Sequence, residues 1–129
     1  MQELLTVEER RDGDVAVVAA VGEVDIQTMR PLREAVRRLA DDGVRYIIVD
    51  LREVGFIDSA GMSVLFAARK AVSEARGQCY VVSRPGAAVR RSLDTIGIER
   101  VMPHLESPDD ALADLRERVG KPIGLATVG

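Results

Sequence analysis

Apolar residues occur along the chain in two alternating patterns, short continuous runs and helix-spaced positions. Val15–Val21 is a strongly apolar run that predicts a strand, and Tyr46–Leu51 predicts a central strand covered on both faces. Gln78–Ser83 is the next predicted strand. Leu4–Glu9 predicts a weaker strand, and the turn residues Asp12-Gly13-Asp14 suggest an N-terminal hairpin.

Four helices are predicted between and after these strands. The first has Thr28 as its expected N-cap and ends at Asp42-Gly43; the second runs from about Ala60 to Ala75. The third ends at Gly97, and the fourth starts at Ser107. Each helix has an apolar face. In chain order, these faces consist of Leu32, Ala35, Val36 and Leu39 in the first helix, Leu65, Ala68 and Val72 in the second, Val89, Leu93 and Ile96 in the third, and Leu112, Leu115 and Val119 in the fourth.

The alternation of strands and helices predicts an α/β sandwich with a mostly parallel central β-sheet, an N-terminal hairpin and about four helices. Ile98–Met102 is expected to be a short edge strand. One domain is expected over residues 1–119, with residues 120–129 as a flexible C-terminal tail.

Composition narrows the function classes. The 129 residues carry a net charge of −3 and include no Trp, which argues against nucleic acid as a direct partner. The single cysteine, Cys79, lies in an apolar strand and is expected to be buried and inert. There is no signal peptide and no apolar stretch of membrane-spanning length, so a cytoplasmic location without membrane association is expected.

Residues for catalysis or metal binding are scarce. His104 is the only histidine, and it is expected to be a solvated loop residue rather than a base, so neither a catalytic triad nor a metal site is expected. No phosphate-binding glycine loop occurs, and no cofactor is expected. Arg84, Arg90 and Arg91 form a basic patch, either a solvated helix face or a partner contact.

Asp58-Ser59-Ala60-Gly61 opens the second helix and is the most informative segment. Backbone N–H groups at a helix N-terminus favour negative charge, so the Ser59 hydroxyl either caps the helix or carries a phosphate. A phosphoacceptor site involving Asp50 and Asp58 is disfavoured, because the acid cluster it needs is incomplete.

Several motifs together resemble the anti-sigma factor antagonists of the STAS domain family, over about residues 5 to 118. The segment Val54–Met62 is the most specific marker. Met62 and residues 120–129 depart from the family pattern. The other markers are Gly22-Glu23-Val24-Asp25, Asp50-Leu51, Gly77-Gln78, Val89-Arg90-Arg91-Ser92-Leu93 and Ile96-Gly97-Ile98.

The resemblance implies a non-enzymatic partner switch. The unphosphorylated protein would bind an anti-sigma factor with serine kinase activity and release a sigma factor. Phosphorylation of Ser59 would end binding, and a PP2C-type phosphatase would restore it. The partner-binding residues are expected to be Asp25, Thr28, Asp58, Ala60, Gly61 and Met62.

Two other functions compete with this one. A STAS scaffold subunit of a signalling or transport complex would use Ser59 only as a helix cap. An enzyme or nucleotide-binding domain would use Asp25, Asp58 and Ser59, but lacks a base and a phosphate loop. Asp25 is expected to lie near Ser59, because connections at the same ends of parallel strands converge.

Overall fold

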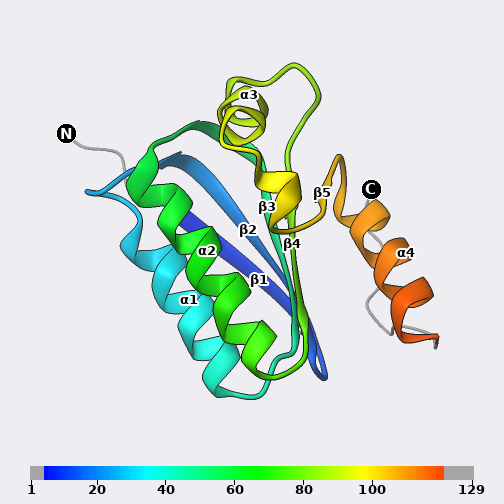
Figure 1. Ribbon diagram of the computed structural model, residues 1–129. Helices are drawn as coiled ribbons and strands as arrows, with labels where there is room; N and C mark the ends of the chain where they lie inside the picture. Colours follow the sequence, from blue (N-terminus) through cyan, green and yellow to red (C-terminus); the bar gives the residue numbers. More distant parts are fainter. Residues whose placement is uncertain (1–4, 121–129) are drawn as a thin grey trace.

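The computed structural model describes residues 5–120 and contains a five-stranded sheet in the order β1-β2-β3-β4-β5 (Figure 1). The strands β1 (Thr6–Asp12) and β2 (Val15–Val24) form the predicted antiparallel hairpin. The strands β3 (Tyr46–Ile57), β4 (Gln78–Val82) and β5 (His104–Leu105) follow in parallel. The expected fold class is confirmed.

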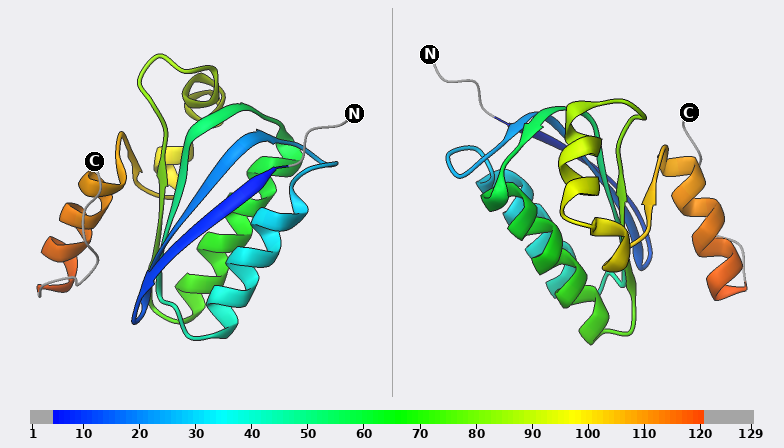
Figure 2. Two further views of the ribbon diagram at one scale, coloured as in Figure 1. Left: turned by 180° about the vertical axis from the view of Figure 1, so that it is seen from behind. Right: turned by 45° about the horizontal axis from the view of Figure 1, so that its top comes forward.

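The helices lie on both faces of this sheet (Figure 2). The helices α1 (Arg30–Asp41) and α2 (Ser59–Glu74) run side by side on one face, and α3 (Ala88–Thr95) covers the upper part of β3 on that side. The helix α4 (Pro108–Val119) packs on the opposite face, where its Leu112 and Leu115 are fully buried.

The alternating side chains of β3 explain these two layers. Ile47 and Val49 belong to the larger core beneath α1, α2 and α3, whereas Ile48 belongs to the smaller core under α4. Successive residues of a strand point to opposite faces, so an uninterrupted apolar run serves both cores at once.

Two element predictions were wrong. The strand predicted to end at Leu51 continues as β3 to Ile57, because its extension stays paired with β2 as far as Val24 across two register shifts. The segment Ile98–Met102, expected to be a strand, contains the 3-10 helix η1 (Ile98–Arg100), whose apolar Ile98 is buried; the edge strand β5 comes later.

The expected N-cap of α1 was also wrong. Thr28 is 6% exposed, and its hydroxyl donates to the Glu23 carbonyl at 2.6 Å, so it stabilises the preceding loop. The N-cap residue is Met29, whose side chain makes no capping hydrogen bond. The predicted tail at 120–129 lies, beyond Gly120, outside the described residues.

Candidate functional site

The C-terminal ends of β2 and β3 bring two loops together. Val24 is paired with Ile57, and the backbone N–H of Asp58 donates to the Val24 carbonyl at 3.1 Å. The chain entering the β2–α1 loop at Asp25 is therefore next to the chain entering α2 at Ser59. The convergence expected from the sequence arises from this parallel pairing.

Asp58 caps α2. Its backbone is extended, and its carboxylate accepts the N–H of Gly61 at 2.9 Å, which satisfies one of the free donors of the first turn. Ser59 is the first residue of the helix and is exposed. Among the hydrogen bonds of residues 5–120, none holds the Ser59 hydroxyl. The helix cap and the exposed hydroxyl are thus provided by two different residues.

Gly61 allows α2 to begin against β2. A Cβ at this position would lie 2.6 Å from the Val24 carbonyl oxygen and 2.8 Å from side-chain carbons of Val24 and Ile57. Only a residue without a side chain fits this contact. The glycine therefore fixes how closely the Ser59 segment approaches the end of β2.

Asp25 shapes the β2–α1 loop. Its carboxylate oxygen Oδ1 accepts the backbone N–H of Gln27 at 2.9 Å and of Thr28 at 3.0 Å. The Thr28 hydroxyl oxygen in turn lies 3.1 Å from Oδ1 of Asp25 and accepts the Asp25 N–H at 3.0 Å. These bonds place Asp25 and Thr28 in one rigid turn beside α2.

Two exposed apolar side chains that the sequence analysis did not single out accompany this turn. Ile26 is 71% exposed and follows Asp25 directly, and Phe56 is 49% exposed near the end of β3. Ala60 and Met62 are half-buried at the start of α2. Ile26 and Phe56 belong to the two chain segments that the Val24–Asp58 hydrogen bond brings together. We call Ile26, Phe56, Ser59 and Met62 the α2-start surface.

The other candidate residues have structural partners. Asp50 is 7% exposed and forms an ion pair with Arg52 at 3.0 Å, a partner that raises the pKa of the Arg52 guanidinium. Asp50 is therefore not an open phosphoacceptor. Cys79 is buried as expected, and burial raises the pKa of its thiol to about 12.

The basic patch divides into separate contacts. Arg84 pairs with Glu53 at 2.6 Å, and Arg91 donates to the Gly86 carbonyl at 2.6 Å. Arg90 is half-buried and donates to the carbonyls of Ser83 and Leu105, both at 2.7 Å. Arg90 therefore holds β4 and β5 together rather than facing solvent.

The expectation for His104 was wrong. This residue lies in β5 with its side chain fully buried, and its Nε2 is 2.5 Å from the Ser83 hydroxyl. Burial, followed by the positive charge of Arg90, lowers the pKa of His104. The partner Ser83 lies 21 residues earlier in the chain, so local sequence gave no signal of the contact.

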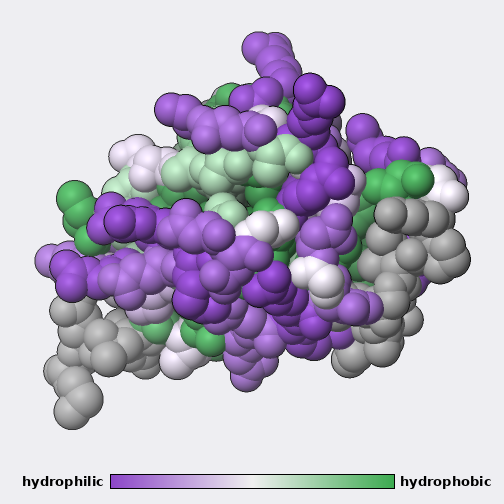
Figure 3. All heavy atoms as spheres, turned by 90° about the horizontal axis from the view of Figure 1, so that it is seen from below, coloured by the Kyte–Doolittle hydropathy of each residue, from purple (hydrophilic) through white to green (hydrophobic). Residues whose placement is uncertain are grey.

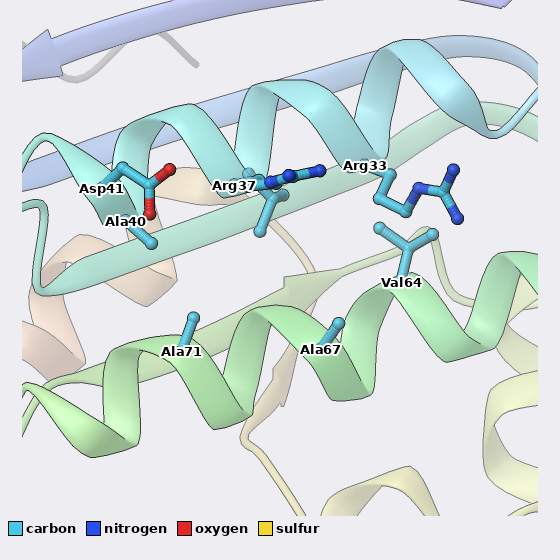
Figure 4. Close-up of a pocket in the computed structure, with 8 residues that line it drawn as sticks. Arg33, Arg37, Ala40, Asp41, Val64, Ala67 and Ala71 are labelled. Atoms are coloured by element: carbon cyan, nitrogen blue, oxygen red, sulfur yellow. The ribbon is translucent and has the colours of Figure 1, made fainter.

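A hollow of about 250 Å³ lies between α1 and α2, away from Ser59 (Figure 4). Ala67 and Ala71 form part of its floor, and Arg33, Arg37 and Asp41 stand on the side of α1. The surface seen from below is mostly hydrophilic, with apolar side chains in a few bands (Figure 3). None of the predicted site residues lines the hollow. Within residues 5–120, no helix combines the length and apolar character needed to span a membrane.

Comparison with known proteins identifies the family and agrees with the fold. The STAS domain model matches residues 6–111, so the chain belongs to the STAS domain family. The anti-sigma-F factor antagonist RsfB of Mycobacterium tuberculosis is 31% identical over 115 residues, covering 87% of this chain and 90% of RsfB.

Solved structures show the same architecture. A crystal structure of an anti-sigma factor antagonist from Mycobacterium paratuberculosis is 29% identical, with a TM-score of 0.78 over 87% of this chain and 94% of the other. The Bacillus protein SpoIIAA in its phosphorylated form has a TM-score of 0.66 at 17% identity, over 86% of this chain and 100% of its own, which is a likeness of fold alone.

Proposed function

We propose that this protein is an anti-sigma factor antagonist controlled by phosphorylation of Ser59. The unphosphorylated form binds an anti-sigma factor that is also an ATP-dependent serine kinase, and so frees a sigma factor. A PP2C-type phosphatase returns the phosphorylated form to the binding state. Because sigma factors act on transcription, the exchange takes place in the cytoplasm. The protein acts as a binder and a substrate, not as an enzyme.

The observation that carries the proposal is the exposed Ser59 on a helix that another residue caps. Asp58 accepts the Gly61 N–H, so α2 does not depend on the Ser59 hydroxyl. A kinase can reach and modify that hydroxyl without unfolding the helix. Relatives named as anti-sigma factor antagonists supply the class of partner.

The α2-start surface suits a partner that binds there. Ile26, two residues after Val24, and Phe56, two residues before Asp58, offer exposed apolar area in the two segments joined by the Val24–Asp58 contact. Apolar anchors at the centre of an interface commonly provide much of its affinity. We place Asp25, Thr28, Asp58, Ala60, Gly61 and Met62 in or beneath this interface, with Asp25 and Thr28 holding the loop in shape.

A phosphate on Ser59 would switch the interface off by charge and bulk. It adds a charge of about −1.5 to −2 at pH 7, beside the carboxylate of Asp58. The positive end of the α2 dipole tolerates this charge, so the fold is retained. Within an interface the same charge loses its water, and an unfavourable charge contact there costs several kcal/mol.

The test combines this protein with ATP and its anti-sigma partner, followed by intact-mass measurement and mapping of the modified peptide. One added phosphate on Ser59 is expected. Ser59→Ala should remain folded, bind the partner and gain no phosphate. Ser63→Ala, one helical turn later, is the matched control and should be phosphorylated like the wild type. Equal phosphate incorporation by Ser59→Ala would place the modification elsewhere.

The same experiment separates the scaffold function. A STAS scaffold subunit would bind partners with no phosphate transfer, and Ser59→Ala would then behave as wild type in every assay. We also propose that residues 1–119 act as one STAS domain, with 120–129 as an appended tail. A chain ending at Gly120 should therefore bind the partner as well as the full chain does.

A further inference from the structure

The structure assigns a divalent metal site to Asp94, Glu99 and His104, with Zn²⁺ as the cation that best fits the donors. Asp94 lies near the end of α3, Glu99 lies in η1 and His104 lies in β5. Their carboxylate and imidazole ligand atoms all lie within 4.8 Å of one another. This site is separate from Ser59 and independent of the proposed function.

The buried imidazole points to a ligand. The His104 side chain is fully buried, and its Nδ1 has no hydrogen-bond partner within the described structure. Nearly all buried polar atoms in proteins have a partner, so an orphaned ring nitrogen indicates a missing one. Nδ1 faces the Asp94 carboxylate, with Oδ1 3.5 Å away.

The other ring nitrogen is already positioned. Nε2 of His104 lies 2.5 Å from the Ser83 hydroxyl, and Ser83 is fully buried. When Nε2 donates its proton to Ser83, Nδ1 presents a lone pair to the two carboxylates. Histidines that bind metals are commonly oriented by such a hydrogen bond on the opposite nitrogen. The backbone N–H groups of Val81 in β4 and of Ser83 just after it donate to the carbonyls of Pro103 and Leu105, which fixes the main chain on either side of His104.

A lone pair that faces carboxylates needs a cation between them. The competing arrangement is the other neutral tautomer, in which Nδ1 carries a proton toward Asp94 and the Ser83 hydroxyl donates to Nε2. Arg90 is held by the Ser83 and Leu105 carbonyls. Its charge opposes a metal, and the two carboxylates outnumber it.

The distances suit a small transition-metal ion. Two ligands on a tetrahedral Zn²⁺ with bonds of about 2.1 Å lie about 3.4 Å apart, close to the Asp94–His104 separation of 3.5 Å. The exposed Glu99 has the freedom to close the remaining gap. One imidazole with two carboxylates favours Zn²⁺, Fe²⁺ or Mn²⁺ over the all-oxygen preference of Mg²⁺ and Ca²⁺.

A hydrolytic triad is the competing explanation of the same residues. Ser83, His104 and Asp94 have the residue types of a triad, with the serine and the acid on opposite ring nitrogens. Ser83 is 0% exposed, so no substrate can reach its hydroxyl. A metal at Nδ1 needs no access to Ser83, and it would link α3 and η1 to β5.

The test is a titration of the untagged full chain with ZnCl₂. Binding is monitored by calorimetry and by the ring-nitrogen NMR signals of the single histidine. One Zn²⁺ per chain should bind and shift the Nδ1 resonance, whereas Mg²⁺ should not. Asp94→Asn and Glu99→Gln should each weaken binding at least tenfold. Glu74→Gln, an exposed carboxylate on α2, is the matched control and should bind as wild type.

Two results would each contradict the metal site. An unchanged Nδ1 signal at millimolar Zn²⁺, or equal affinity of the wild type, Asp94→Asn and Glu99→Gln, overturns the assignment. These two variants alter exposed side chains and should fold normally. Circular dichroism of the metal-free proteins checks this, so a loss of binding cannot be attributed to unfolding.

Discussion

Gly61 lies directly against Val24, where the first turn of α2 meets the end of β2. A Cβ on Gly61 would come within 2.6 Å of the Val24 carbonyl oxygen, and the Asp58 N–H donates to that same oxygen at 3.1 Å. Helix start and strand end are therefore one packed unit. Ser59, between Asp58 and Gly61 in sequence, is presented from this unit.

Gly61→Ala should destabilise the protein. Alanine favours a helix over glycine by about 1 kcal/mol, but overpacking against a backbone atom typically costs about 1–3 kcal/mol. We expect a net loss of about 1–2 kcal/mol in the free energy of unfolding, measured by urea denaturation. Gly55→Ala in β3 is the control, because a Cβ there meets nothing within 4 Å. Equal stability of both variants would contradict the close contact.

Ile26→Ala should weaken binding of the anti-sigma partner at least tenfold while leaving stability within about 0.5 kcal/mol of wild type. The reason is that Ile26 is 71% exposed, so it contributes to a partner contact and little to the core. Ile96→Ala, 43% exposed at the end of α3, is the matched control. Calorimetric titration with the partner measures the affinity of both variants. A loss of affinity in Ile96→Ala alone would move the interface away from the α2-start surface.

Asp25→Ala should reduce partner affinity or the phosphorylation rate by more than it reduces stability. The carboxylate organises the turn that carries Ile26 through bonds to Gln27 and Thr28. Asp25→Asn keeps an acceptor oxygen and should recover most of the binding. Asp12→Ala, in the β1–β2 hairpin at the opposite end of β2, should have no effect. If Asp25→Ala lowers only the melting temperature, Asp25 has a structural role alone.

Cys79 should be unreactive in the folded protein. Burial disfavours its thiolate and raises the pKa of the thiol to about 12, so at pH 8 the reactive form is scarce and shielded. A thiol reagent such as Ellman's reagent should detect no thiol in native protein, and one per chain after denaturation. Rapid reaction of the native protein at pH 8 would contradict the burial.

The sequence predicted the elements whose signals are local. Asp58 before an apolar helix indicated the start of α2, and the unbroken run from Tyr46 predicted the central strand with its two covered faces. The extension of β3 beyond Leu51 could not be read, because Arg52, Glu53 and Gly55 are poor strand signals. Pairing with β2 across two register shifts imposes the strand there.

Tertiary contacts decided the residues that the sequence misplaced. Thr28 precedes a Pro31-containing helix and therefore looks like a cap, but its hydroxyl is already bonded to Glu23 and Asp25. His104 follows a proline and looks like a loop residue, but Ser83 and Arg90 enclose it from other elements. In both cases the structural role depends on a hydrogen-bond partner that the spacing of neighbouring residues in the sequence does not indicate.

The most direct measurement of the central claim is the affinity of the anti-sigma partner for the two forms of this protein. Unphosphorylated and Ser59-phosphorylated chains, purified and verified by mass, are titrated into the partner by calorimetry. A cost of several kcal/mol corresponds to at least a hundredfold weaker binding of the phosphorylated form, with an unchanged circular dichroism spectrum. Equal affinity of the two forms would contradict the switch at Ser59.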